Sequence, residues 1–106
     1  METKDSARLE LTADLFKAIG HPMRLAMLEK LKEMPWCVCE LAEHLGLNKS
    51  VASKHLSLLY DLGVLDMEKR GTQVIYSLVT PCVVDMSNCS YQAVVQQRLR
   101  RLGATA

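Results

Sequence analysis

The chain has 106 residues, of which 49% are hydrophobic and 24% are charged, and its formal net charge is +1. This length suits a single domain, and with one Phe, one Trp and three Tyr its core must be mainly aliphatic, which favours helices over a β-sandwich. The small net charge excludes neither DNA nor an acidic partner, because affinity for phosphate depends on where the charges lie.

No apolar run is long enough to span a bilayer, and the N-terminus lacks the pattern of a signal peptide. We therefore expect a cytoplasmic protein with no membrane partner. Because cytoplasmic thiols are kept reduced, the four cysteines are expected to be reactive, metal-ligating or buried rather than paired in disulfides.

The predicted elements follow one another as one domain, 1–106, without linkers or repeats. Residues 1–8 are polar and are expected to be frayed. Apolar residues at helical spacing predict a first helix that ends at Gly20 and a second helix with Pro22 in its first turn. Pro35 then interrupts the chain.

A helix-turn-helix is predicted over 37–62. Its first helix ends at Gly46, and Asn48 is a suitable N-cap for its second helix. A β-hairpin that turns at Gly71-Thr72 is predicted over 64–79, and Thr80 and Pro81 open a last helix over 81–102. The predicted fold is therefore mainly α with one small β-hairpin, a winged helix-turn-helix.

The second helix of this pair is predicted to bury Val51 or Ala52, His55, Leu56, Leu59 and Leu62 and to expose Lys and Ser side chains. Short hydroxyl side chains let a helix approach base edges closely, and Lys can contact phosphate or guanine. A polar helix face alone is more often merely solvated, but a hairpin with a basic tip directly after it favours DNA binding. The predicted DNA-contacting residues are Asn48, Lys49, Ser50, Ser53, Lys54, Ser57, Lys69, Arg70 and Thr72.

Three stretches, LFKAIGHPMRLAMLEKL, CVCELAEHLGLNKSVASKHLSLLYDLGVL and KRGTQVIYSL, resemble the ArsR/SmtB family of small bacterial and archaeal transcriptional repressors. The resemblance implies a homodimer joined through the first and last helices, which binds a two-fold operator and leaves it when an effector binds. Two recognition helices would enter successive major grooves about 34 Å apart, so the double-stranded operator should be an imperfect inverted repeat.

The resemblance also implies a role for Cys37-Val38-Cys39, which is similar to the thiolate site of arsenic(III)- and cadmium/lead-responsive members. The sequence departs from the arsenic pattern, because no third cysteine follows the pair. Residues two apart on a regular helix also point about 200° apart, so both thiols can face one ion only if the helix start unwinds.

Cys82 and Cys89 are candidates for the missing ligands. They share a face of the last helix but are separated by about 10.5 Å along its axis, too far to clamp one ion within a single chain. Either antiparallel last helices bring Cys82 of one chain near Cys89 of the other, or Cys82 turns toward Cys37 and Cys39.

Three interpretations of the thiols stay open. The first is a sensor of a thiophilic metal or metalloid, arsenic(III), antimony(III) or a soft divalent ion, bound by Cys37, Cys39, Cys82 and Cys89. The second is thiol oxidation or persulfidation. In the third the thiols only pack, and the repressor responds to an organic, sulfur-containing metabolite. A zinc site of the His/carboxylate kind is not expected on the last helix, because 82–101 contains no His and only Asp85.

No enzyme is expected, because the sequence has no Gly-rich phosphate motif, no paired carboxylates and no thioredoxin-like pattern around the cysteines. The more serious rival to a repressor is a protein-interaction module that uses the winged helix only as a scaffold.

Overall fold

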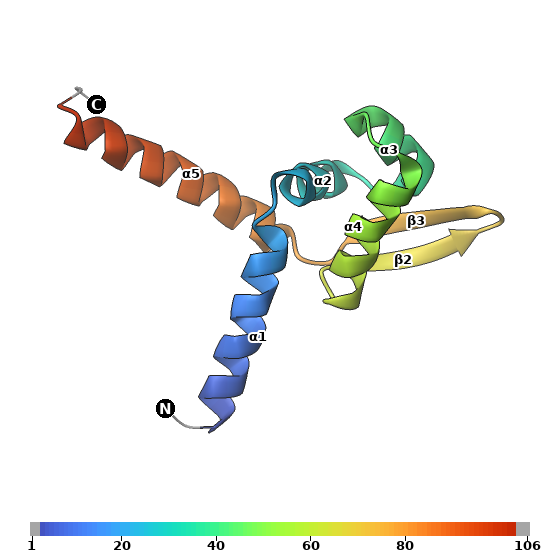
Figure 1. The fold of residues 1–106 in the computed structure, drawn as a ribbon, viewed down its shortest axis with the longest axis horizontal. Coiled ribbons are helices and arrows are strands. Elements are labelled where there is room, and N and C mark those ends of the chain that lie inside the picture. The colour runs from blue at the N-terminus through green and yellow to red at the C-terminus, as the bar shows by residue number, and fades with distance from the viewer. Residues whose placement is uncertain (1–2, 104–106) are drawn as a thin grey trace.

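The computed structural model describes residues 3–103. In chain order the elements are α1 (Thr3–Ile19), α2 (Pro22–Glu33), β1 (Trp36–Cys37), α3 (Val38–Leu45), α4 (Lys49–Asp61), β2 (Leu65–Arg70), β3 (Gln73–Leu78) and α5 (Pro81–Arg101). The predicted winged helix-turn-helix is confirmed: α2, α3, α4 and the hairpin form the body, while α1 and α5 leave it as two diverging arms (Figure 1).

The core lies between α2, α3, α4 and the inner side of the hairpin. Its most deeply buried large side chains are aliphatic, as the composition predicted: Met27, Leu28, Leu41, Leu56, Leu59 and Val64. Tyr76 is the one aromatic side chain among the buried hydrophobic residues of the described chain, and its burial raises the pKa of its hydroxyl. Tyr60 packs edge-on against it, with ring centroids 6.5 Å apart.

The hairpin is part of a three-stranded antiparallel sheet with the order β1-β3-β2. The strand β1 was not predicted, because two residues are too few to show a period. In β1, Trp36 pairs with Tyr76 and Cys37 pairs with Ile75. The backbone of Cys37 is therefore joined to the inner strand of the wing.

Two helix starts differ in detail from the sequence prediction. The helix α1 begins at Thr3, so 3–8 are helical where fraying of 1–8 was expected, and 1–2 lie outside the described residues. An early Asp5 and a late Lys17 both complement the helix dipole. Thr80 precedes α5, but its side chain makes no capping hydrogen bond and its Oγ1 is buried without a partner among the described residues.

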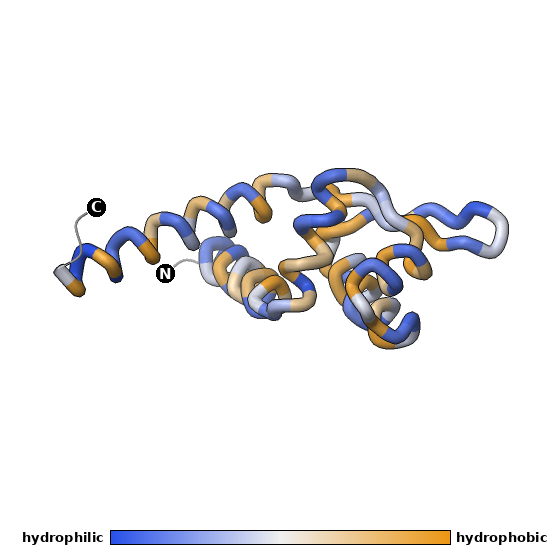
Figure 2. The backbone as a smooth tube through the Cα atoms, turned by 90° about the horizontal axis from the view of Figure 1, so that it is seen from above, coloured by the Kyte–Doolittle hydropathy of each residue, from blue (hydrophilic) through white to orange (hydrophobic). Residues whose placement is uncertain are grey.

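The two arms give the chain an extended shape. Its radius of gyration is 16.6 Å, whereas a compact domain of this length has about 13 Å. In α5 only Val83 and Val84 are buried, yet hydrophobic segments recur along α5 to its far end (Figure 2). Between residues 3 and 103, no helix has the length and apolar character needed to cross a membrane.

Candidate DNA-binding face and thiol pocket

A tight turn fixes the angle between α3 and α4. Gly46 ends α3 with a left-handed backbone (φ 68°), a conformation that residues with a Cβ rarely adopt. Two residues later Asn48 caps α4, and its Oδ1 accepts hydrogen bonds from the Ser50 backbone N–H at 2.8 Å and from Ser50 Oγ at 2.7 Å. The capped end, which carries Lys49 and Ser50, is exposed.

The helix α4 has one buried side and one polar side. Ala52, Leu56 and Leu59 are fully buried, whereas Val51, the alternative to Ala52 in the predicted stripe, is 42% exposed. The polar side follows the prediction in its exposure: Asn48, Lys49, Ser50, Lys54 and Ser57 are exposed, and Ser53 is half-buried. This arrangement leaves a row of Lys and Ser side chains open to a partner.

The tip of the wing is basic and exposed. Lys69, Arg70 and Thr72 flank Gly71, which takes a positive φ of 62° to close the hairpin. Arg70 Nη2 pairs with Glu68 Oε2 at 3.2 Å, so part of its charge is already compensated on the wing.

Arg24, His21 and His55 form a cluster at the base of α4 that was not predicted from the sequence. Arg24 of α2 donates from Nε to Nδ1 of His55 at 3.2 Å and from Nη1 to the carbonyl oxygen of Ala18 at 3.0 Å. His21 caps α2 and lies beside His55, with ring centroids 4.9 Å apart. Partial burial, followed by electrostatic repulsion from Arg24 and His21, lowers the pKa of His55. The cluster links α1, α2 and the recognition helix.

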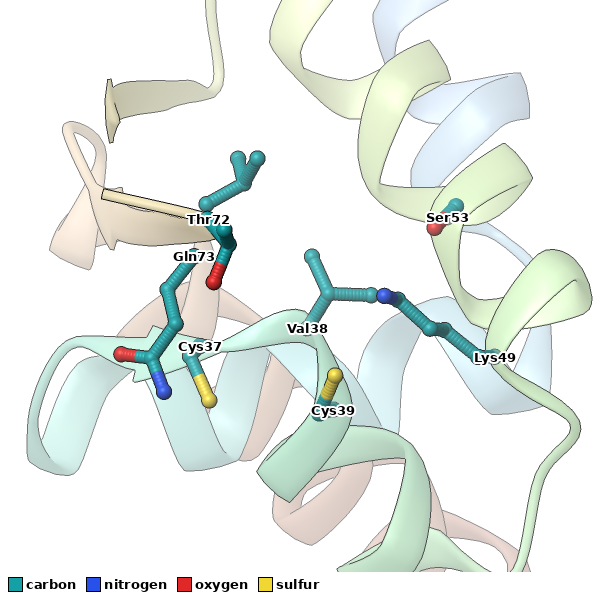
Figure 3. Close-up of a pocket in the computed structure, with 8 residues that line it drawn as sticks. Cys37, Val38, Cys39, Lys49, Ser53, Thr72 and Gln73 are labelled. Carbon is teal, nitrogen blue, oxygen red and sulfur yellow. The ribbon is translucent and has the colours of Figure 1, made fainter. Parts of the chain in front are cut away.

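Cys37 and Cys39 lie in one pocket, although they are only two residues apart (Figure 3). Cys37 does not belong to the helix: it has extended backbone angles (φ −78°, ψ 152°) and caps α3, with its Sγ accepting from the Glu40 backbone N–H at 3.4 Å. The helix start is therefore unwound at the first cysteine, as the shared-ion hypothesis requires. Cys37 is buried and Cys39 is exposed.

The other walls of this pocket come from α4 and the wing. Lys49 and Ser53 of α4 face it, and Thr72 and Gln73 of the wing lie on the opposite side. Val74 also lines the pocket. In Figure 3 the Lys49 ammonium reaches over the start of α3, and the Gln73 amide lies beside Cys37. Three predicted DNA-contacting residues, Lys49, Ser53 and Thr72, thus line the same pocket as two predicted metal ligands. Gln73 and Val74 had no signal in the sequence, since only the β1–β3 pairing brings them here.

Cys82 and Cys89 lie exposed on α5 and do not line this pocket. Among residues 3–103 no three His, Cys, Asp or Glu side chains are grouped so that they could hold one metal ion. Within one chain, Cys82 therefore lies apart from the pocket that holds Cys37 and Cys39, and the metal-ligand role of Cys82 and Cys89 stays a prediction.

Comparison with known sequences shows what this chain is similar to. Residues 21–66 match the family described as bacterial regulatory protein, arsR family. The chain is 34% identical over 70 residues to the HTH-type transcriptional repressor SmtB of Mycobacterium tuberculosis, a match covering 66% of this chain and 52% of SmtB. It is 36% identical over 73 residues to the uncharacterized HTH-type transcriptional regulator MJ1325 of Methanocaldococcus jannaschii, covering 68% of this chain and 82% of that protein. The chain thus spans about half the length of SmtB.

Solved structures share the fold over nearly the whole chain. The antimony-specific transcriptional repressor AntR superposes with a TM-score of 0.74 at 26% identity, covering 92% of this chain and 89% of AntR. The homodimeric winged helix-turn-helix DNA-binding domain of Mb0332 from Mycobacterium bovis gives a TM-score of 0.74 at 25% identity, covering 95% of this chain and 93% of that domain.

Proposed function

The chain belongs to the ArsR family of bacterial regulatory proteins, and we propose that it is a DNA-binding repressor that leaves its operator when an effector binds. The family consists of transcriptional regulators, so the expectation that the chain is not an enzyme is confirmed. One observation carries the proposal: α4 buries its aliphatic side and presents Lys and Ser side chains outward, next to a wing with a basic tip.

We assign the DNA contacts by the chemistry of each position. Lys54 is exposed on α4 and can reach phosphate or guanine, while the small Ser50 and Ser57 allow close approach to base edges. Lys69 and Arg70 at the wing tip are placed to contact the flanking backbone. Asn48, Lys49, Ser53 and Thr72 complete the proposed contact set.

A homodimer supplies the second half of the contact surface. Mb0332 is homodimeric, and the arms of the present chain leave Leu11 65% and Tyr91 70% exposed to solvent. These large apolar side chains become buried when α1 and α5 pack against a second copy of the chain. The two recognition helices of the dimer then face one side of a two-fold operator.

We propose that the effector is a thiophilic metal or metalloid bound at Cys37 and Cys39. The unwound start of α3 places both thiols in one pocket, and thiolates are suitable ligands for soft ions. AntR, which has the same fold, is antimony-specific. Cys82 and Cys89 are left out of this site, because both are exposed on α5 and neither lines the pocket.

The DNA proposal is tested with a duplex selected from a random library by binding to the native protein. We expect the selected sequences to contain an inverted repeat.

Replacing Lys54 and Arg70 together with Ala should weaken binding and reduce the slope of log K against log salt by about one for each phosphate that a subunit no longer neutralises. Lys4→Ala with Arg100→Ala is the matched control, because it removes the same two charges near the ends of the arms. An unchanged slope in the first double variant argues that these residues do not touch DNA and favours the interaction-module alternative.

The effector proposal is tested by adding arsenite, antimonite, cadmium or a persulfide donor to the protein–DNA complex. We expect release by the thiophilic ions and loss of that release in Cys37→Ser and in Cys39→Ser, but not in Cys82→Ser or Cys89→Ser. Release by the persulfide donor alone would favour thiol oxidation. Equal release from a variant without any of the four thiols would favour an organic metabolite.

A further inference from the structure

The thiol pocket is incomplete as a sulfur site but contains several oxygen- and nitrogen-bearing side chains. Cys37 and Cys39 contribute its only two sulfur atoms, and the described residues hold no grouping that would supply a third metal-binding Cys, His or carboxylate. On the α4 wall of the pocket stand the ammonium of Lys49 and the hydroxyl of Ser53, and the amide of Gln73 lies beside Cys37 (Figure 3). These groups hydrogen-bond oxygen and are poor ligands for a soft ion.

We propose that this pocket takes a trivalent metalloid hydroxide through two sulfur atoms and one retained oxygen, and that Lys49 and Ser53 on the α4 wall hold that oxygen. This inference rests on the proposed effector site and names its ligand set. A trivalent centre needs three bonds, which two thiols and one oxygen satisfy, whereas a soft divalent ion in a tetrahedral site would still lack two ligands. The number of donors in the pocket therefore favours the metalloid.

The binding step balances without any change of oxidation state. Arsenite enters as As(OH)₃, two S–H bonds and two As–OH bonds break, two S–As bonds form, and two water molecules leave. The third hydroxyl stays on arsenic. Its oxygen can accept from the Lys49 ammonium, a charge-assisted hydrogen bond that is stronger than a neutral one.

The same assignment explains how the ligand opposes DNA. Lys49 and Ser53 belong to the proposed DNA contacts, and they face the pocket from the first two turns of α4. A Lys49 ammonium held by the retained hydroxyl is withdrawn from phosphate. The ligand and DNA then compete for the same side chains, and each weakens the binding of the other by the same factor.

The ligand set is tested by X-ray absorption at the arsenic edge, on reduced native protein with one equivalent of arsenite per chain. We expect two As–S bonds and one As–O bond. The double variant Cys82→Ser, Cys89→Ser should give the same spectrum. Three As–S bonds in the native protein would overturn the inference, because a thiol from α5 or from a second copy would then complete the site.

The role of Lys49 is tested with a matched pair of lysines on α4. Lys49→Met removes the ammonium that reaches the pocket, and Lys54→Met removes one that does not line it. Arsenite should bind about tenfold more weakly to Lys49→Met and with native affinity to Lys54→Met, while both variants bind the selected duplex more weakly. Equal arsenite affinity in the two variants would overturn the oxygen-holding role.

The outcomes separate this inference from the proposed function. Three As–S bonds together with normal release of DNA leave the arsenite-responsive repressor intact and remove only the two-sulfur, one-oxygen site. Two As–S bonds and one As–O bond without any release of DNA support the site and contradict the effector proposal. Absence of arsenite binding to the native protein overturns this inference, and the effector proposal is overturned as well only if antimonite and cadmium also fail to release DNA.

Discussion

The pair formed by Arg24 and His55 shows how one side chain can support the recognition helix. His55 must be neutral to accept the hydrogen bond from Arg24 Nε at 3.2 Å, because a protonated imidazole has no free lone pair. Protonation would also add a positive charge beside Arg24 and His21. Lowering the pH therefore weakens the hydrogen bond between Arg24 of α2 and His55 of α4.

This hydrogen bond makes stability depend on pH in a defined direction. Burial and the neighbouring Arg24 and His21 lower the pKa of His55 below 6.5, so the unfolded chain takes up a proton first as the pH falls. The His55 contribution to stability is complete above pH 6.5 and disappears as the pH falls from there through the folded-state pKa. Urea unfolding between pH 7.5 and 5 should show this decrease, and His55→Asn, which keeps an acceptor but does not titrate, should reduce the pH dependence. Identical pH profiles would contradict the assignment.

At the scale of the element, α4 depends on its buried side. Leu56 points from α4 into the core and is fully buried, whereas Leu58 on the same helix is 37% exposed. Leu56→Ala should lower the free energy of unfolding by about 2–5 kcal/mol, because the transfer energy of the removed atoms disappears and a cavity is left behind. Leu58→Ala should cost clearly less, and urea unfolding of the two variants measures the difference. A similar cost for both would mean that the inward face of α4 is assigned wrongly.

The elements that the sequence predicted well are those with a clear period or a clear end signal. The inner stripe of α4 follows the helical period, and Gly46 and Gly71 mark turns that need a positive φ. The strand β1 was missed because its two residues form a strand only through pairing with β3, which is distant in the sequence. Without β1, nothing in the sequence could show that Cys37 leaves the helix.

The pocket was predictable only in part, for the same reason. The two thiols, Lys49 and Ser53 were each identified, but as members of two separate sites. Their convergence with Gln73 depends on the turn at Gly46 and on the position of the wing, which are tertiary features. The Arg24–His55 hydrogen bond likewise joins residues 31 positions apart, and neither side chain carries a local signal of the other.

At the scale of the whole molecule, the arms are difficult to explain for an isolated chain. The helix α5 has 21 residues but buries only Val83 and Val84, and its apolar residues continue at helical spacing through Tyr91, Leu99 and Leu102. These three side chains are 70%, 48% and 82% exposed. A long helix with an uncovered apolar stripe is expected to pack against another surface, and a second copy provides one of the same kind.

The stripe on α5 leads to a prediction about assembly. A charge at Leu99 would have to be buried without a partner when two copies pack, so Leu99→Glu should convert the dimer to a monomer with little change in helix content. Gln97→Glu introduces the same charge two residues away, about 200° around the helix, and should leave the dimer intact. Sedimentation velocity measures the difference.

The Leu99→Glu monomer should also bind the selected duplex much more weakly, because its recognition helix can occupy only one half-site at a time. A Leu99→Glu protein that still sediments as a dimer would show that the copies meet through another face.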